Sequence, residues 1–229
     1  AFYGATRFCI GLAKKVLLAD AAGKVAAQIL DGSAASATTA AAWLGIVLYT
    51  FEIYFDFSGY SDMAIGMGRI FGFKYPENFR LPYTSRSITE FWRRWHISLG
   101  SFFRDYVYIP LGGKKKHQLL NLAVVWPLTG LWHGASWNFV LWGLYFFVIL
   151  AAEKTIGEKR LRRIPTILRR VGTMLLVILG WNIFYFTDLT QLLQHFGLLL
   201  GLLGAGFSNA QTGIQLVNNL PLLLVCAIG

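Results

Sequence analysis

Acidic residues and cysteines are scarce in this sequence. Its 229 residues include 11 Asp and Glu against 21 Lys and Arg, and only two cysteines, Cys9 and Cys226. The two cysteines lie far apart in apolar surroundings and match no disulfide framework, metal-binding spacing or CxxC redox motif. We therefore interpret both as inert core thiols.

Charge of either sign is missing from two long segments. Residues 118–152 contain no Asp, Glu, Lys or Arg, and residues 171–229 contain only Asp188. Such runs are long enough for membrane helices, and a composition that is 55% hydrophobic is too apolar for an ordinary soluble domain. We therefore expect an all-α, multi-spanning membrane protein. Because the chain starts without Met and stops inside an apolar run, we expect residues 1–229 to be a single-domain fragment of it.

The basic residues are concentrated in the middle of the chain. Fifteen of the 21 fall between residues 80 and 170, in two blocks around an uncharged segment. Membrane proteins place such blocks in cytoplasmic loops, so this distribution argues against a nucleic-acid partner. If both blocks are cytoplasmic, residues 118–152 must enter the membrane and return, with arms of about 25 Å each. The break of this hairpin is predicted at GLWHGAS, and it places His133 within the membrane or near its far face.

Residues 87–108 are predicted to form one interfacial helix. Ser87 and Glu90 make a capping box, and apolar residues recur behind it at three- and four-residue spacing. On such a helix His96 lies at the flank of the apolar stripe, beside Trp92, which by itself favours a packing role.

Another apolar helix is predicted at residues 40–55. It is followed by DFSGYSDMAIGMGRIFGF, in which we expect Asp56 and Asp62 to pair with Arg69.

Most familiar catalytic motifs are missing. No HExxH or HxxxH spacing supports a metal site, and no GxSxG elbow supports a serine hydrolase. GMGRIFG follows no predicted strand, so it is not a nucleotide-binding loop. His133 remains the main candidate, because imidazole exchanges a proton near neutral pH and can activate a hydroxyl group. The alternative is a structural histidine whose ring is satisfied by backbone carbonyls at a helix kink.

Several stretches carry a resemblance to a known family. They are GLAKKVLLAD, the segment from EIYFDFSGYSDM through FWRRWHISLGSF to IPLGG, LTGLWHGASWNFVLWG and LGWNIFYF. In this order they resemble the membrane-bound O-acyltransferase family, and in particular its bacterial branch, whose members act in alginate O-acetylation and, more distantly, in teichoic acid D-alanylation. The resemblance covers nearly the whole chain.

The resemblance implies a polytopic helical bundle with interfacial and broken or re-entrant helices, in which a funnel and a tunnel meet near a catalytic histidine. It implies that His133 of WHG is that histidine, and that His96 of FWRRWH assists it. It further implies a multi-pass protein of the bacterial inner membrane without a bound cofactor. Acetyl-CoA or an acyl carrier would supply the acyl group from the cytoplasm. A polysaccharide such as alginate would accept it, with the help of an extracytoplasmic hydrolase-like partner.

Three other functions stay open at this point. Another enzyme of the family would transfer D-alanyl or a different acyl group to a cell-envelope polymer. A transporter or polymer-export channel would use the buried histidine as a proton relay. A non-catalytic membrane scaffold would tolerate substitution of both histidines.

Overall fold

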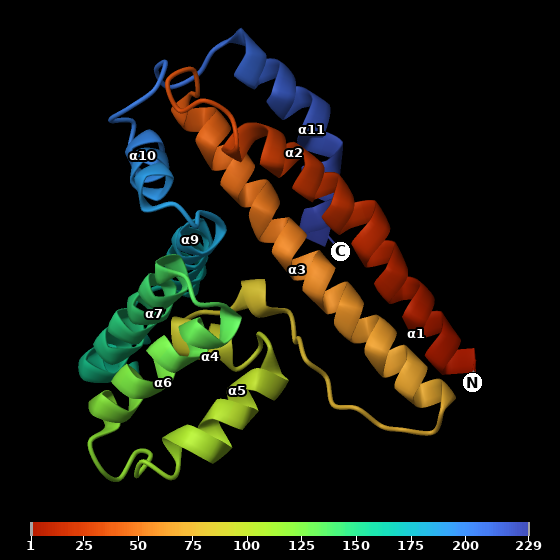
Figure 1. The fold of residues 1–229 in the computed structure, drawn as a ribbon, viewed down its shortest axis with the longest axis vertical. Coiled ribbons are helices and arrows are strands. Elements are labelled where there is room, and N and C mark those ends of the chain that lie inside the picture. The colour runs from red at the N-terminus through yellow and green to blue at the C-terminus, as the bar shows by residue number, and fades with distance from the viewer. Residues whose placement is uncertain (1, 229) are drawn as a thin grey trace. The chain divides into compact units, whose positions relative to one another are not determined.

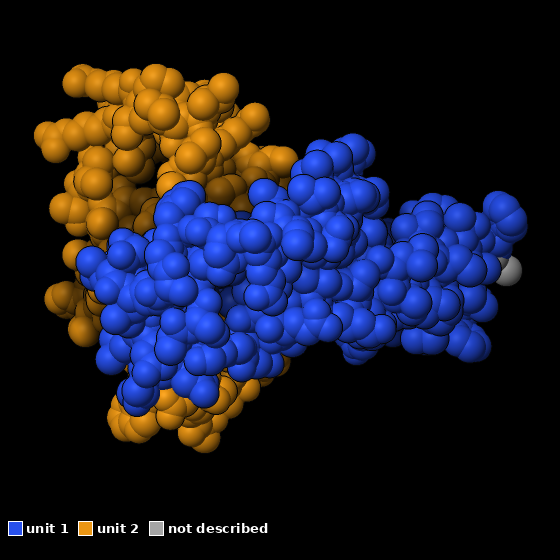
Figure 2. Space-filling view, turned by 90° about the horizontal axis from the view of Figure 1, so that it is seen from above, with its two compact units in different colours: residues 1–76, 189–229 blue, residues 77–188 orange. Residues whose placement is uncertain are grey.

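The computed structural model describes residues 2–228, and this part of the chain is helical, without a β-strand. The all-α prediction is therefore confirmed. The helices form two compact units, coloured separately in Figure 2: residues 1–76 with 189–229, and residues 77–188. Helices long and apolar enough to cross a membrane occur in both units: α3 (Thr39–Ile70), α7 (Trp137–Ile156), α9 (Thr166–Tyr185) and α11 (Ala210–Ile228).

The first unit is built on α3. The rest of the unit consists of α1 (Phe2–Ala13), the π-helical η1 (Lys14–Ala19), α2 (Asp20–Leu30), α10 (Leu189–Leu199) and α11. Helices α1 and α2 run beside α3 along most of its length (Figure 1). The structure extends the predicted helix at residues 40–55, because α3 continues through the DFSGYSDM segment to Ile70.

Glycines at seven-residue spacing bring α1 and α3 into backbone contact. A Cβ atom on Gly11 would lie 2.5 Å from the carbonyl oxygen of Gly59, and one on Gly4 would lie 2.6 Å from that of Gly66. The opposing glycines are equally restricted, since a Cβ on Gly59 would lie 2.6 Å from the carbonyl oxygen of Gly11. Small residues of this kind let membrane helices approach closely.

Asp56 and Asp62 of α3 pair with residues of α1 and η1, not with Arg69 as expected. Asp62 accepts hydrogen bonds from Arg7 at 2.8 Å and from Lys14 at 2.9 Å, and Asp56 pairs with Lys15. Arg69 instead lies 5.9 Å from the ring centroid of Tyr3. The prediction that these carboxylates form ion pairs is confirmed, but the predicted partner was wrong. The actual partners lie about fifty residues earlier in the chain, on the neighbouring helices, so spacing within α3 could not identify them.

The second unit carries both candidate histidines. Its elements are the 3₁₀ turn η2 (Pro82–Thr84), α4 (Ile88–Trp92), α5 (Ile97–Phe103), the π-helical η3 (Arg104–Tyr108), α6 (Gln118–His133), α7, α8 (Glu158–Leu161) and α9. Helices α6 and α7 form the predicted hairpin, with its break at residues 134–136. Their backbones touch at Gly130, where a Cβ atom would lie 2.1 Å from the carbonyl oxygen of Phe139.

The predicted single helix over residues 87–108 is wrong. Its start is as expected, since the Ser87 hydroxyl accepts from the Glu90 N–H at 3.0 Å. The helix then stops after Trp92 and begins again at Ile97. Between the two pieces His96 adopts the left-handed conformation, with φ of 43° and ψ of 56°, which costs an ordinary residue about 1–2 kcal/mol.

Candidate functional site

His133 is the last residue of α6. The backbone is extended at Gly134, and α7 starts three residues further on, at Trp137. The half-buried imidazole lies in an aromatic shell. Its ring centroid is 5.2 Å from those of both Trp142 and Phe184, and both rings meet the imidazole nearly edge-on.

The shell around His133 joins three helices. Trp142 belongs to α7 and Phe184 to α9, and Asn138 on α7 donates a hydrogen bond to the carbonyl oxygen of Phe184 at 3.1 Å. Trp142 and Asn138 are fully buried, with exposures of 1% and 0%. The position of the His133 ring at the helix break is therefore fixed by tight packing.

His96 lies on the turn between α4 and α5, and it too is half-buried. Burial and, to a smaller extent, the nearby imidazole of His133 together lower the pKa of His96 to about 4. The imidazole is therefore neutral at physiological pH, in the form that accepts a proton.

The structure brings the two predicted site residues together. Trp132 links them, since its ring centroid lies 5.8 Å from that of His96 and 4.9 Å from that of His133. The His96 turn and the break after His133 thus face one region of the second unit, although the two residues come from different elements.

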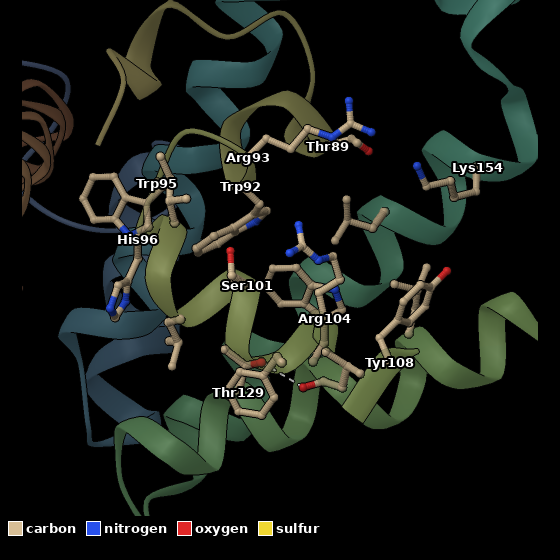
Figure 3. Close-up of a pocket in the computed structure, with 18 of the residues that line it drawn as sticks. Thr89, Trp92, Arg93, Trp95, His96, Ser101, Arg104, Tyr108, Thr129 and Lys154 are labelled. Carbon is tan, nitrogen blue, oxygen red and sulfur yellow. Dashed lines mark hydrogen bonds between the residues drawn. The ribbon is translucent and has the colours of Figure 1, made fainter. Parts of the chain in front are cut away.

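A cavity of about 350 Å³ opens beside His96 (Figure 3). Trp92, Trp126 and Val125 contribute apolar wall, while Arg104 and Lys154 contribute positive charge. Figure 3 shows His96 on one side of this cavity and Lys154 on the other. His133 does not line it. The cavity therefore leads from basic side chains to His96, over an apolar surface.

A second, polar cavity of about 710 Å³ adjoins the first. Thr89, Arg93 and Lys154 line both cavities. Arg86 and Glu90 also border the polar one. Burial alone would raise the pKa of Glu90, but hydrogen bonds from Arg86 and the charges of Arg94 and Arg86 leave it below its usual value. The polar cavity is therefore bordered by fixed charges of both signs.

Sequence reasoning missed two residues that hold the His96 region. The carboxylate of Glu153, on α7, accepts hydrogen bonds from the N–H of Ile88 and Thr89 at 2.6 and 2.9 Å. Asn78 accepts from the backbone N–H of Ser98 at 3.1 Å. An acidic residue at the end of a long uncharged run was a signal for Glu153. Nothing in the sequence singled out Asn78.

Among residues 2–228 no group of three or more His, Cys, Asp or Glu side chains is arranged to hold a metal ion. The described residues offer two kinds of chemistry. The imidazoles of His96 and His133 can accept and return a proton, and the basic side chains of the cavity beside His96 can attract an anionic group.

The sequence is similar to several bacterial proteins that are named as O-acetylases, O-acetyltransferases or D-alanyltransferases. The chain is 50% identical to a probable alginate O-acetylase of Pseudomonas fluorescens over 184 residues, 79% of this chain and 37% of the relative. It is 40% identical to a peptidoglycan O-acetyltransferase of Helicobacter pylori over 203 residues, 86% of this chain and 38% of the relative. It is 36% identical to a teichoic acid D-alanyltransferase of Bacillus subtilis over 153 residues, 59% of this chain and 39% of the relative.

The chain thus spans less than half the length of these relatives. Residues 3–195 match the model of the membrane-bound O-acyltransferase family, and they include both candidate histidines and the hairpin between the basic blocks. The chain therefore belongs to the membrane-bound O-acyltransferase family.

Proposed function

We propose that the full-length protein is an O-acyltransferase of the bacterial inner membrane that moves an acetyl group toward an extracytoplasmic polysaccharide such as alginate. The observation that carries the proposal is that Trp132 contacts both His133 and His96, and that His96 lines a cavity with basic side chains, in a chain of this family. The names of the relatives support a cell-envelope polysaccharide as the acceptor.

In the proposed reaction the oxygen of an acceptor hydroxyl attacks the carbonyl carbon of an acyl thioester. His133 accepts the hydroxyl proton as the new C–O bond forms, and the proton passes to the sulfur as the C–S bond breaks. His96 positions the thioester or stabilises the charge that develops on the carbonyl oxygen. The acceptor gains an ester, and the donor leaves as a free thiol. An extracytoplasmic hydrolase-like protein would complete delivery to the polymer.

The donor of this proposal is an acetyl-CoA or an acylated carrier from the cytoplasm, either of which carries phosphate. Arg93, Lys114 and Lys154 surround the cavity, and none of them forms a salt bridge with another residue of the described chain. Cations that lack an anionic partner attract a phosphate group. The apolar wall near His96 would then hold the acyl end.

The two histidines are tested in full-length protein in membranes, by the release of label from an acyl donor. We expect His133→Ala to abolish acyl transfer, and His96→Ala to reduce it by about a hundredfold, with normal membrane insertion. The matched control is His117→Ala, because His117 is exposed and shares the left-handed backbone of His96, with φ of 47° against 43°. Wild-type turnover in His133→Ala would contradict the catalytic assignment. Absence of any acyl release by the wild type would favour the transporter or scaffold alternatives.

The proposed binding of the donor phosphate is tested with a variant that lacks two cavity cations and with two donors, one of which lacks phosphate. Arg93→Gln combined with Lys154→Gln is expected to raise KM for acetyl-CoA by about tenfold or more, while leaving KM for acetylpantetheine unchanged. The control is Lys159→Gln, at an exposed lysine of α8 that lines neither cavity. Equal effects on both donors would show that the cations do not bind the phosphate. Transfer of D-alanine but not acetate from the matching donors would assign the chain to the other acyl group.

A further inference from the structure

The turn that carries His96 is braced by the segment directly before η2. The backbone N–H of Ile97 donates to the carbonyl oxygen of Asn78 at 3.0 Å, and the N–H of Arg80 donates to the carbonyl oxygen of Arg94 at 3.0 Å. These two bonds flank His96 on either side. The chain from Asn78 to Arg80 therefore lies along the turn and ties both of its ends.

The side chain of Asn78 adds a second attachment. Its Oδ1 accepts hydrogen bonds from the Ser98 N–H at 3.1 Å and from the Ser98 hydroxyl at 3.0 Å. The N–H groups of Ile97 and Ser98 are the first two of α5, and neither has an acceptor within its own helix. Asn78 thus caps α5 from outside, with both its backbone and its side chain.

Aromatic side chains pack residues 78–83 against α4 and the turn that follows it. The ring of Phe79 meets that of Trp95 edge-on at 5.0 Å, and Tyr83 stacks on Phe91 at 6.2 Å. Phe91 of α4 is 0% exposed and Trp95, in the turn after α4, is 4% exposed, so residues 78–83 are anchored to buried rings of both the helix and the turn. The hydrogen bonds of Asn78 are therefore made by a firmly placed residue.

The sequence of residues 87–108 favours a continuous helix, whereas residues 78–80 hold the backbone of His96 in a left-handed conformation. The apolar spacing of residues 87–108 favours one continuous helix, and the left-handed conformation at His96 is uncommon for a residue with a side chain. A strained backbone persists when its surroundings determine it. Without the cap on α5, His96 would relax toward the right-handed helical conformation, and its ring would turn away from Trp132.

We propose that Asn78 is a positioning residue of the acyltransferase, which caps α5 so that His96 stays in the left-handed conformation that aims its ring toward Trp132 and His133. The inference rests on the proposed role of His96. Asn78 touches no reacting atom in this proposal, and it acts only through the placement of the imidazole.

The test is acyl transfer by full-length protein in membranes, expressed per mole of folded protein. Asn78→Ala is expected to lower kcat by about ten- to a hundredfold, the cost of misplacing a reactive group by about 1 Å, with less than a twofold change in KM for the donor. Asn78→Asp should restore most of the activity, since a carboxylate oxygen accepts the same two bonds from Ser98. The matched control is Asn209→Ala, because Asn209 Oδ1 likewise accepts from the N–H and the hydroxyl of Thr212, both at 2.9 Å. That variant should retain wild-type kcat.

A double-mutant cycle separates this inference from the proposed function. In a His96→Ala background, Asn78→Ala should reduce the remaining activity by less than twofold, because the imidazole it positions is gone. If the activity losses of the two single variants multiply in the double variant, the inference is overturned while His96 remains catalytic. Wild-type kcat in the single Asn78→Ala variant would overturn the inference as well. Full activity in His96→Ala would refute the role of His96 itself. If Asn78→Ala does not accumulate, Ser98→Ala removes one of the two side-chain bonds and should lower kcat by about threefold; an unchanged kcat would contradict the proposal.

Discussion

Glu153 joins the helix hairpin to the segment that precedes His96. Its Oε1 accepts from the Ile88 N–H at 2.6 Å, and its Oε2 accepts from the N–H and the hydroxyl of Thr89 at 2.9 and 2.6 Å. Helix α7 follows the break at His133, and α4 leads into the turn at His96. One carboxylate thus fixes the two candidate catalytic elements against each other.

The substitution Glu153→Gln keeps the shape of the side chain and removes its charge. One oxygen can still accept the two bonds from Thr89, while the new amide group faces the N–H of Ile88 and cannot accept from it. Hydrogen bonds to a charged group contribute about 1.5–3 kcal/mol each and neutral ones about 0.5–1.5 kcal/mol. The polar cavity beside Glu153 has room for water, and a water that bonds the freed N–H would offset part of the loss. The docking of α4 should therefore weaken by about 2 kcal/mol, which is about 30-fold in the opening equilibrium.

Hydrogen exchange of the full-length protein in membrane discs measures this opening directly. The amides of Ile88 and Thr89 are expected to exchange about 30-fold faster in Glu153→Gln than in the wild type. Glu158→Gln is the matched control, because Glu158 borders the same cavity but pairs with Arg162 on the exposed surface, where an ion pair contributes about 0–1 kcal/mol. Equal exchange rates in Glu153→Gln and the wild type would refute the reasoning.

The other predictions concern packing, pH and topology. Gly11→Ala should destabilise the detergent-solubilised protein relative to Gly172→Ala by about 2 kcal/mol, because the new Cβ meets backbone at 2.5 Å in the first case and nothing within 4 Å in the second; equal melting temperatures would contradict the close contact. Because burial lowers the pKa of His96 to about 4, any acid limb of the pH–rate profile that His96→Asn abolishes should lie well below pH 6.5, and a limb near 6.5 that disappears in this variant would contradict the burial. Cysteines introduced at Lys115 and Arg163 should both react with a thiol reagent from the cytoplasmic side, and reaction of only one would contradict the hairpin topology.

The break at His133 could be predicted from sequence because charge and length constrain it together. Two basic blocks that belong on the same side of a membrane require a return, and the glycines of GLWHGAS mark where the return is easiest. The structure confirms this element, with α6 ending at His133 and α7 starting at Trp137. The constraint is local, and it needs no knowledge of how distant segments pack.

The break at His96 could not be predicted in the same way. Its apolar spacing continues from Trp92 through Trp95 to Leu99 as if the helix did not stop, because Trp95 before His96 is buried and Leu99 after it is half-buried. What interrupts the helix is a set of bonds from Asn78 and Arg80, and their pairing with the turn depends on tertiary structure. Hydrophobic periodicity reports which residues are covered, and it does not report where a backbone is bent to let a side chain reach a neighbouring element.

The length of α6 sets the depth at which its break, and the ring of His133, would lie in a membrane. Helix α6 has 16 residues, about 24 Å, whereas the hydrocarbon layer is about 30 Å thick. An arm that starts at the cytoplasmic boundary therefore ends inside that layer, and the backbone of residues 134–136 needs hydrogen-bond partners there. Ala135 is exposed, whereas Gly134 and Ser136 are half-buried, so the described part of the protein covers the break only in part. A water-filled path from the far face would supply partners to the open backbone, and under the proposed function the same path would admit acceptor hydroxyls to His133.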